Sequence, residues 1–152
     1  MSRRRAREFA LQALYQVDTS ESAGRSALNG LWAGLASEDG IAGARVADEE
    51  ERAFALRLVD GVAKHKERID GLIEEASTNW RLARMPVVDR NILRLASFEL
   101  AECTDVPANV SINEAIELAK KFGDKDSRAF VNGILDRIAA ETGRGGRRHR
   151  GN

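Results

Sequence analysis

The chain has 152 residues, of which 43% are hydrophobic and 32% are charged, so it is long enough to bury the core of one globular domain. Cys103 is its single cysteine, which excludes an intrachain disulfide and a thiolate metal cage and favours a reducing cytoplasm. It contains no run of 18 apolar residues and nothing that resembles a signal peptide, so we expect no membrane partner.

The formal net charge of zero hides a division along the chain. Residues 1–7 and 143–152 each carry four arginines and no acid, which leaves 16 basic against 24 acidic residues in the body. A clustered basic patch is typical of nucleic-acid-binding proteins, whereas an acidic body can attract a basic protein. The charge pattern therefore allows two partners, a nucleic acid and a protein.

The N-terminal arginines, Arg3, Arg4, Arg5 and Arg7, stand at the start of a segment with helical periodicity. The N-terminus of a helix carries a partial positive charge, which disfavours cations and favours anions. Two interpretations follow. The arginines form a solvated end that aids solubility, or they form half of a site whose other half is an anion.

All the predicted elements of the first half of the chain are helical. Apolar residues at three- and four-residue spacings predict helices near residues 3–18 and 28–35, followed by a glycine-rich loop. Asp48 and Glu51 are spaced as a capping box at the start of a long helical stretch. We expect Gly61 to bend that stretch.

The second half continues with three helices. Pro86 is expected in the first turn of a helix that is apolar on several sides, which predicts that it runs through the middle of a bundle. Ser111 and Glu114 are spaced as the capping box of the next helix, and Gly123 is expected to end it. The last helix includes Gly133, which we expect to permit the close approach of another backbone.

Four blocks of the sequence resemble the NusB family of bacterial transcription antitermination factors: RRRAREFALQALY, VDRNILRLASFEL, INEAIELAKKF and FVNGILD. They stand in the order and approximate spacing of that family, between Arg3 and about Ala140. The resemblance implies an all-α fold, a compact helical bundle of about six to seven helices in two small subdomains. A seventh helix is then expected at WRLARM. We expect residues 1–142 to form a single RNA-binding domain and residues 143–152 a disordered basic tail.

The resemblance also implies a function. Members of this family bind a short single-stranded RNA signal called boxA in ribosomal RNA leader transcripts, as a heterodimer with the ribosomal protein NusE, and they meet other Nus factors and RNA polymerase indirectly. Phosphate is then the anion expected at the N-terminal arginines. The alternative is a stand-alone RNA-recruiting domain that resembles the N-terminal part of ribosomal RNA cytosine methyltransferases.

A second candidate RNA-binding site lies in the segment KKFGDKDSRAF, where basic residues surround a predicted helix break next to an aromatic ring. Its candidate residues are Lys121, Asp126, Arg128 and Phe130, and the resemblance places Asp126 and Phe130 near the RNA and adds Asp89. Two alternatives remain open, because Phe130 also fits a core position and Asp126 also fits a helix N-cap.

The sequence gives little support for catalysis. His65 and His149 are the only histidines, neither forms a recognisable pattern with Cys103, and no metalloprotease or nucleotide-binding motif is present. We therefore expect no enzyme activity, no catalytic residue, no metal site and no cofactor. Trp32 and Trp80 are expected to serve as core or interface anchors.

Overall fold

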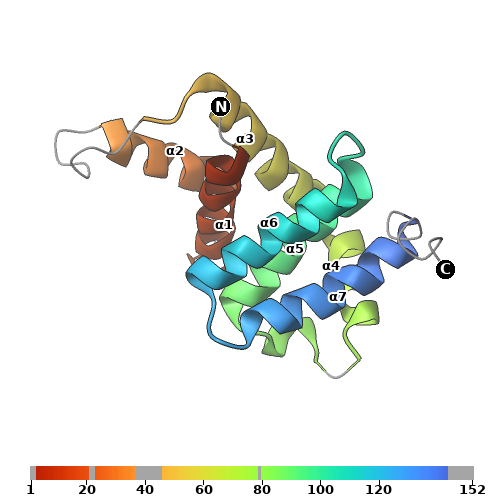
Figure 1. Ribbon diagram of the computed structural model, residues 1–152. Helices are drawn as coiled ribbons and strands as arrows, with labels where there is room; N and C mark the ends of the chain where they lie inside the picture. The colour runs from red at the N-terminus through yellow and green to blue at the C-terminus, as the bar shows by residue number, and fades with distance from the viewer. Residues whose placement is uncertain (1–2, 21–22, 37–45, 79, 144–152) are drawn as a thin grey trace. The chain divides into compact units, whose positions relative to one another are not determined.

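The computed structural model is built from helices in two compact units, Met1–Lys64 and His65–Asn152 (Figure 1). The residues that it describes are 3–20, 23–36, 46–78 and 80–143. Among these residues no strand occurs, which confirms the expected all-α fold in two subdomains. None of the described helices combines the length and the apolar character needed to cross a membrane.

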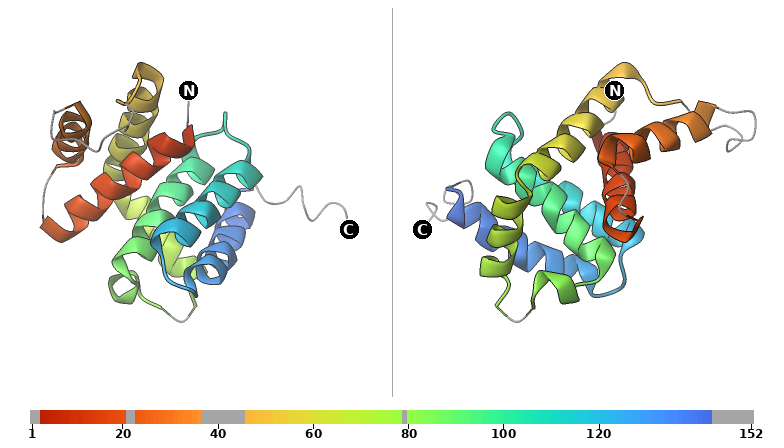
Figure 2. Two further views of the ribbon diagram at one scale, coloured as in Figure 1. Left: turned by 60° about the vertical axis from the view of Figure 1, so that its left-hand side comes forward. Right: turned by 180° about the vertical axis from the view of Figure 1, so that it is seen from behind.

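The first unit consists of α1 (Arg3–Ser20), α2 (Gly24–Ala36) and α3 (Glu49–Lys64), and each helix packs against the other two (Figure 2). Three buried alanines on one face of α1 leave room for its neighbours. The rings of Phe9 and Trp32 meet edge to face, with centroids 6.1 Å apart and planes at 87°. Trp32 is buried, so it serves as a core anchor as expected.

The predicted capping box at the start of α3 is confirmed. The backbone N–H of Glu51 donates to Oδ1 of Asp48 at 2.8 Å, and the N–H of Asp48 donates to Oε1 of Glu51 at 3.0 Å. The first turn of α3 carries three glutamates, where negative charge interacts favourably with the helix dipole. Glu51 is fully buried, so it also places a carboxylate inside the unit.

Helix α3 continues through Gly61 without a break, and the helical stretch is interrupted at His65. There the backbone has φ −109° and ψ 21°, and α4 (Lys66–Ala76) begins at the next residue. The ring of His65 stacks on that of Phe98, with centroids 6.1 Å apart and planes at 24°. The WRLARM segment contains a single 3-10 turn, η1 (Leu82–Arg84), so the described chain has seven α-helices and one such turn.

The second unit is completed by α5 (Val87–Glu102), α6 (Ala108–Phe122) and α7 (Ser127–Glu141). The central helix is α5, which packs against α4, α6 and α7, while α6 and α7 also lie side by side (Figure 1). Every residue of α5 from Asn91 to Leu100 is buried. The prediction that this helix runs through the middle of a bundle is confirmed.

The capping box predicted for Ser111 and Glu114 is wrong. Helix α6 begins at Ala108, directly after Pro107, so Ser111 lies inside its first turn. The hydroxyl of Ser111 is buried and donates to Oε1 of Glu99 on α5 at 2.8 Å. A tertiary partner has thus replaced the local one. The predicted end of this helix at Gly123 is confirmed.

Gly133 lies within α7, as predicted, but the expected reason is wrong. A Cβ atom added at this position would meet no other heavy atom within 4 Å, so no backbone approaches closely there. Two further predictions concern residues that the structure does not describe. They are the predicted loop over residues 37–47, of which residues 37–45 are not described, and the predicted tail over residues 143–152, of which residues 144–152 are not described.

The capping box yields the first testable prediction. Asp48→Ala removes the acceptor that satisfies the N–H of Glu51 and should lower the free energy of unfolding by about 0.5–2 kcal/mol, as for other N-caps. Urea denaturation followed by circular dichroism measures this change. Glu50→Ala, an exposed residue of the same turn, is the control. An equal decrease in the free energy of unfolding in the two variants would show that the negative charge of this turn stabilises the protein and that the capping hydrogen bond does not.

Candidate nucleic-acid interface

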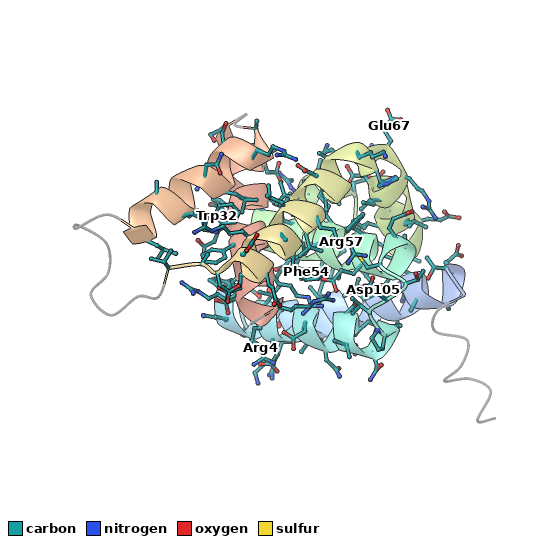
Figure 3. The ribbon with its side chains drawn as sticks, turned by 90° about the horizontal axis from the view of Figure 1, so that it is seen from above. Arg4, Trp32, Phe54, Arg57, Glu67 and Asp105 are labelled. Atoms are coloured by element: carbon teal, nitrogen blue, oxygen red, sulfur yellow. The ribbon has the colours of Figure 1, made fainter. Side chains whose placement is uncertain are left out.

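The first candidate surface is the arginine cluster, which comprises Arg3, Arg4, Arg5 and Arg7 in the first turns of α1. The first turn of this helix contains no acidic residue. The side chain of Arg4 is exposed and points outward from the ribbon (Figure 3). Arg7 is buried. The cluster therefore combines an exposed cation with cations held against the protein.

The aromatic ring of Phe54 on α3 contacts the arginine cluster. The guanidinium carbon of Arg3 lies 4.2 Å from the centroid of its ring, and that of Arg7 lies 5.3 Å away. Arg57, one turn further along α3, places its guanidinium carbon 5.9 Å from the same centroid. An aromatic face carries partial negative charge, which attracts cations and orients planar guanidinium groups. One ring thus gathers three arginines from two helices.

Arg5 is held by two other groups of the same unit. Its guanidinium carbon lies 5.0 Å from the ring centroid of Phe9, and its Nη1 lies 3.5 Å from Oε1 of Glu51. This carboxylate oxygen is the one that closes the capping box of α3. Two aromatic rings and one buried carboxylate therefore offset the unfavourable position of cations at the start of α1.

The second candidate surface is the turn between α6 and α7, and it is built around Ser127. A Cβ added at Gly123 would lie 2.4 Å from Oγ of Ser127 and 2.8 Å from the carbonyl oxygen of Ala119, so only glycine fits. The N–H of Asp124 donates to Oγ of Ser127 at 3.0 Å, and the N–H of Asp126 donates to Oδ1 of Asp124 at 2.9 Å. Asp126 occupies the N-cap position of α7, as the alternative predicted, but its side chain makes no capping hydrogen bond.

Asp89 lies beneath this turn rather than on the surface. It is 4% exposed, and its Oδ1 accepts a hydrogen bond from the hydroxyl of Ser127 at 2.7 Å. Burial raises the pKa of Asp89, the hydrogen bond from Ser127 opposes that rise, and the negative charge of Asp124 adds to it. Asp89 is therefore placed to position the turn, not to touch a ligand directly.

The remaining predicted residues of this surface differ in exposure. Lys121, Asp126 and Arg128 are exposed, whereas Phe130 is only partly buried. The ring of Phe130 meets the ring of Trp80 edge to face, with centroids 6.4 Å apart and planes at 80°. Trp80 is itself 50% exposed. Phe130 is thus partly exposed and packs against a second exposed aromatic ring, so it is not a fully buried core residue.

The sequence reasoning missed Phe54, Glu51 and Arg57 as partners of the arginine cluster, and Trp80 as the partner of Phe130. One local signal was available, because Arg57 follows Phe54 by three residues and such pairs share a helix face. The other contacts join residues far apart in the chain, and no spacing rule links them. Within the described chain, no three histidine, cysteine or acidic side chains gather closely enough to hold a metal ion.

Known proteins show clear similarity to this chain. Residues 4–140 match the model of the NusB family. The chain is 49% identical over 138 residues to the transcription antitermination protein NusB of Myxococcus xanthus, covering 91% of this chain and 94% of that protein. It is 52% identical over 138 residues to the protein of the same name from Trichlorobacter lovleyi, covering 91% and 90%.

Solved structures agree with this likeness. The structure of T. maritima NusB superposes with a TM-score of 0.78 at 38% sequence identity, covering 93% of this chain and 92% of the other. A chain from a crystal structure of the antitermination factors NusB and NusE in complex with dsRNA gives a TM-score of 0.78 at 26% identity, covering 93% and 99%.

The buried carboxylate of Asp89 yields a prediction with a definite sign. Because its pKa is raised in the folded state, the stability it contributes is present below the ordinary pKa of aspartate, about 3.9, and is lost as the pH rises through the raised value. The free energy of unfolding of the wild type minus that of Asp89→Asn should therefore fall as the pH rises from acid to neutral. Urea denaturation across this range measures the difference.

Ser127→Ala provides the matched background for that measurement. Removing the hydroxyl removes the hydrogen bond that favours the charged form of Asp89, so the fall with pH should become larger. A difference between the wild type and Asp89→Asn that stays constant with pH would show that burial does not perturb this carboxyl group.

Proposed function

Because this chain belongs to the NusB family, we propose that it acts as a transcription antitermination factor that binds boxA-type RNA in ribosomal RNA leader transcripts together with the ribosomal protein NusE. The observation that carries the proposal is the arginine cluster on α1, where Phe54 holds the guanidinium groups of Arg3 and Arg7. The names of the relatives support the role in antitermination, and the similar complex of NusB, NusE and RNA supports the partners.

The chemistry of the arginine cluster suits the RNA backbone. Guanidinium groups donate paired hydrogen bonds that match phosphate oxygens, and an exposed helix N-terminus favours an anion. The rings of Phe54 and Phe9 restrict the guanidinium groups of Arg3, Arg5 and Arg7 before RNA arrives. Less side-chain entropy is then lost on binding than with freely moving arginines. Arg4, which is exposed, completes the cluster as the residue open to solvent.

The turn between α6 and α7 is the second part of the proposed RNA surface. Lys121 and Arg128 offer exposed positive charge, Asp126 offers an exposed acceptor, and Phe130 offers part of a ring to a base. Asp89 acts through the hydroxyl of Ser127, which it holds at the start of α7. This assignment makes Asp89 a positioning residue.

The acidic body supports NusE as the protein partner. Outside the two basic ends, the chain contains 16 basic and 24 acidic residues. Helix α3 has three glutamates in its first turn. Negative surface steers a basic ribosomal protein toward the chain and leaves the arginine cluster for phosphate. The proposed role is one of binding without a catalytic step, and its place is the cytoplasm, where leader transcripts are made. No observation favours the alternative role as a recruiting domain for a methyltransferase.

The arginine cluster can be tested through salt. Replacing all four arginines, Arg3, Arg4, Arg5 and Arg7, with glutamine should weaken the binding of leader RNA. Loss of two to four phosphate contacts should reduce the slope of log affinity against log salt by roughly 1.4 to 2.8, at about 0.7 per contact for a single strand. Fluorescence anisotropy at several salt concentrations measures both quantities.

The control for that experiment is Arg25→Gln, because Arg25 is an exposed arginine of α2 that pairs with Asp60 outside the cluster. It should leave the slope unchanged. If the variant with all four arginines replaced keeps the wild-type RNA affinity and the wild-type salt slope, the cluster is only a solvated helix end and does not bind RNA.

The protein partner is tested by titrating boxA-type leader RNA with this protein, with NusE, and with both. The two proteins together should bind the RNA more tightly than either alone, because two basic surfaces then act on one strand. Their own association should slow as salt is raised, since screening weakens the steering between acidic and basic surfaces. A mixture that binds no better than the stronger single protein, with no complex in the absence of RNA, would exclude NusE as the partner.

A further inference from the structure

A pocket of about 230 Å³ lies in the second unit, between α7 and the segment that follows α4. Its aromatic walls are Trp80 and Phe130, whose rings meet edge to face. The rest of its lining comes from Ser77, Thr78, Ala129, Gly133, Ile134 and Arg137. Trp80 also lines a second, adjoining hollow, together with Glu74 and Arg81. Trp80 is half exposed, so its indole ring is accessible while it remains in contact with Phe130.

Gly133 contributes to the lining of this pocket. Glycine is unfavourable inside a helix, and here no neighbouring backbone requires it, because a Cβ would meet nothing within 4 Å. Gly133 is instead part of the pocket lining, and the space at its Cβ position is open. A large side chain at this position is therefore expected to reduce access to the cavity.

We propose that this pocket, formed by Trp80, Phe130 and Gly133, receives one unpaired nucleobase of the RNA. Two aromatic rings at a steep angle suit a flat heteroaromatic group, which can stack on one ring and meet the edge of the other. Thr78 offers a hydroxyl to the edge of a base. The guanidinium group of Arg137 is held at the wall by donating from Nη1 to the carbonyl oxygen of Ala76 at 2.6 Å.

The surrounding charge favours a nucleic acid over an apolar protein side chain. Arg81 lies beside Trp80, Arg137 lines the pocket, and Arg128 is exposed in the turn of α7 that carries Phe130. The acidic residue that lines the adjoining hollow is Glu74, whose Oε2 already accepts a hydrogen bond from the backbone N–H of Leu82 at 3.1 Å. A base in the pocket would thus bring its phosphates toward arginines.

This inference deepens the proposed function and depends on it for the identity of the RNA. A duplex offers no free base, so the pocket predicts that single-stranded leader RNA binds more tightly than the same sequence paired with its complement. Trp80→Leu should weaken the binding of the single strand about 5- to 150-fold, as for the loss of one stacked base, and should leave the salt slope unchanged.

An abasic scan identifies the base. RNAs that each lack one base should include a single position whose loss weakens wild-type binding but hardly affects Trp80→Leu, because base and ring then act as one pair. If each abasic substitution lowers the RNA affinity of the wild type and of Trp80→Leu by the same factor, no base occupies this pocket. If Trp80→Leu impairs binding of NusE alone and leaves RNA binding unchanged, the pocket takes a protein side chain and the inference is wrong.

Gly133→Leu tests the pocket without removing an aromatic ring. The added side chain should obstruct the cavity and weaken RNA binding at least fivefold, while the melting temperature does not fall, because leucine is a better helix former than glycine. Gly71→Leu is the matched control, since Gly71 is an exposed glycine inside α4 with nothing within 4 Å of its Cβ position. Equal RNA affinities of the two variants would overturn the inference.

Nucleoside monophosphates separate the failure of the pocket from the failure of the proposed function. At millimolar concentration they should shift the indole N–H signal of Trp80 in an NMR spectrum and leave that of the buried Trp32 in place. Absence of this shift for all four nucleotides overturns the pocket, even if leader RNA binds elsewhere. A shift of Trp80 in a protein that binds no leader RNA would retain the pocket and reject the proposed function.

Discussion

The second unit depends on a helix that is buried on all sides and still carries charge. Asp89, Arg94 and Glu99 follow one another at intervals of five residues along α5, so successive side chains point about 140° apart around the helix axis. Each therefore faces a different neighbouring helix. Their partners are Ser127 on α7 at 2.7 Å, Asp70 on α4 at 2.9 Å and Ser111 on α6 at 2.8 Å. Because an unpaired buried charge is costly, these three contacts fix the register of all four helices.

That register also determines the candidate RNA surface of this unit. Asp89 lies in the first turn of α5 and holds Ser127 at the start of α7, while Gly123 lets the chain pass close to the same hydroxyl. The exposed residues Lys121, at the end of α6, and Arg128, at the start of α7, flank this turn. Their positions depend on the buried hydrogen bond between Asp89 and Ser127. A substitution at Asp89 is therefore expected to alter the proposed RNA surface through Ser127 rather than through direct contact with RNA.

Local patterns in the sequence gave correct predictions wherever the deciding residues are neighbours in the chain. The capping box of Asp48 and Glu51, the end of α6 at Gly123 and the central position of α5 all belong to this class. The prediction for Ser111 failed because its partner is not a neighbour in the chain. Its hydroxyl fits the pattern of a local cap, but it donates to the buried carboxylate of Glu99, twelve residues earlier. The same holds for the candidate site. Its arginines are visible in the sequence, but the ring of Phe54 that gathers them is not identifiable without the fold.

The two units offer different kinds of recognition. Contacts between guanidinium groups and phosphates carry no sequence information, so the arginine cluster alone would bind any RNA strand with similar strength. Selection of one sequence must come from groups that touch a base, and in the described chain the rings of Trp80 and Phe130 form the aromatic pair with a cavity beside it. Stacking is itself tolerant of base identity, so the discrimination within such a pocket rests on polar groups at its edge. The hydroxyl groups of Ser77 and Thr78 and the guanidinium group of Arg137 line it, so in the proposed base pocket these polar groups, rather than the arginine cluster, would read the identity of a bound base.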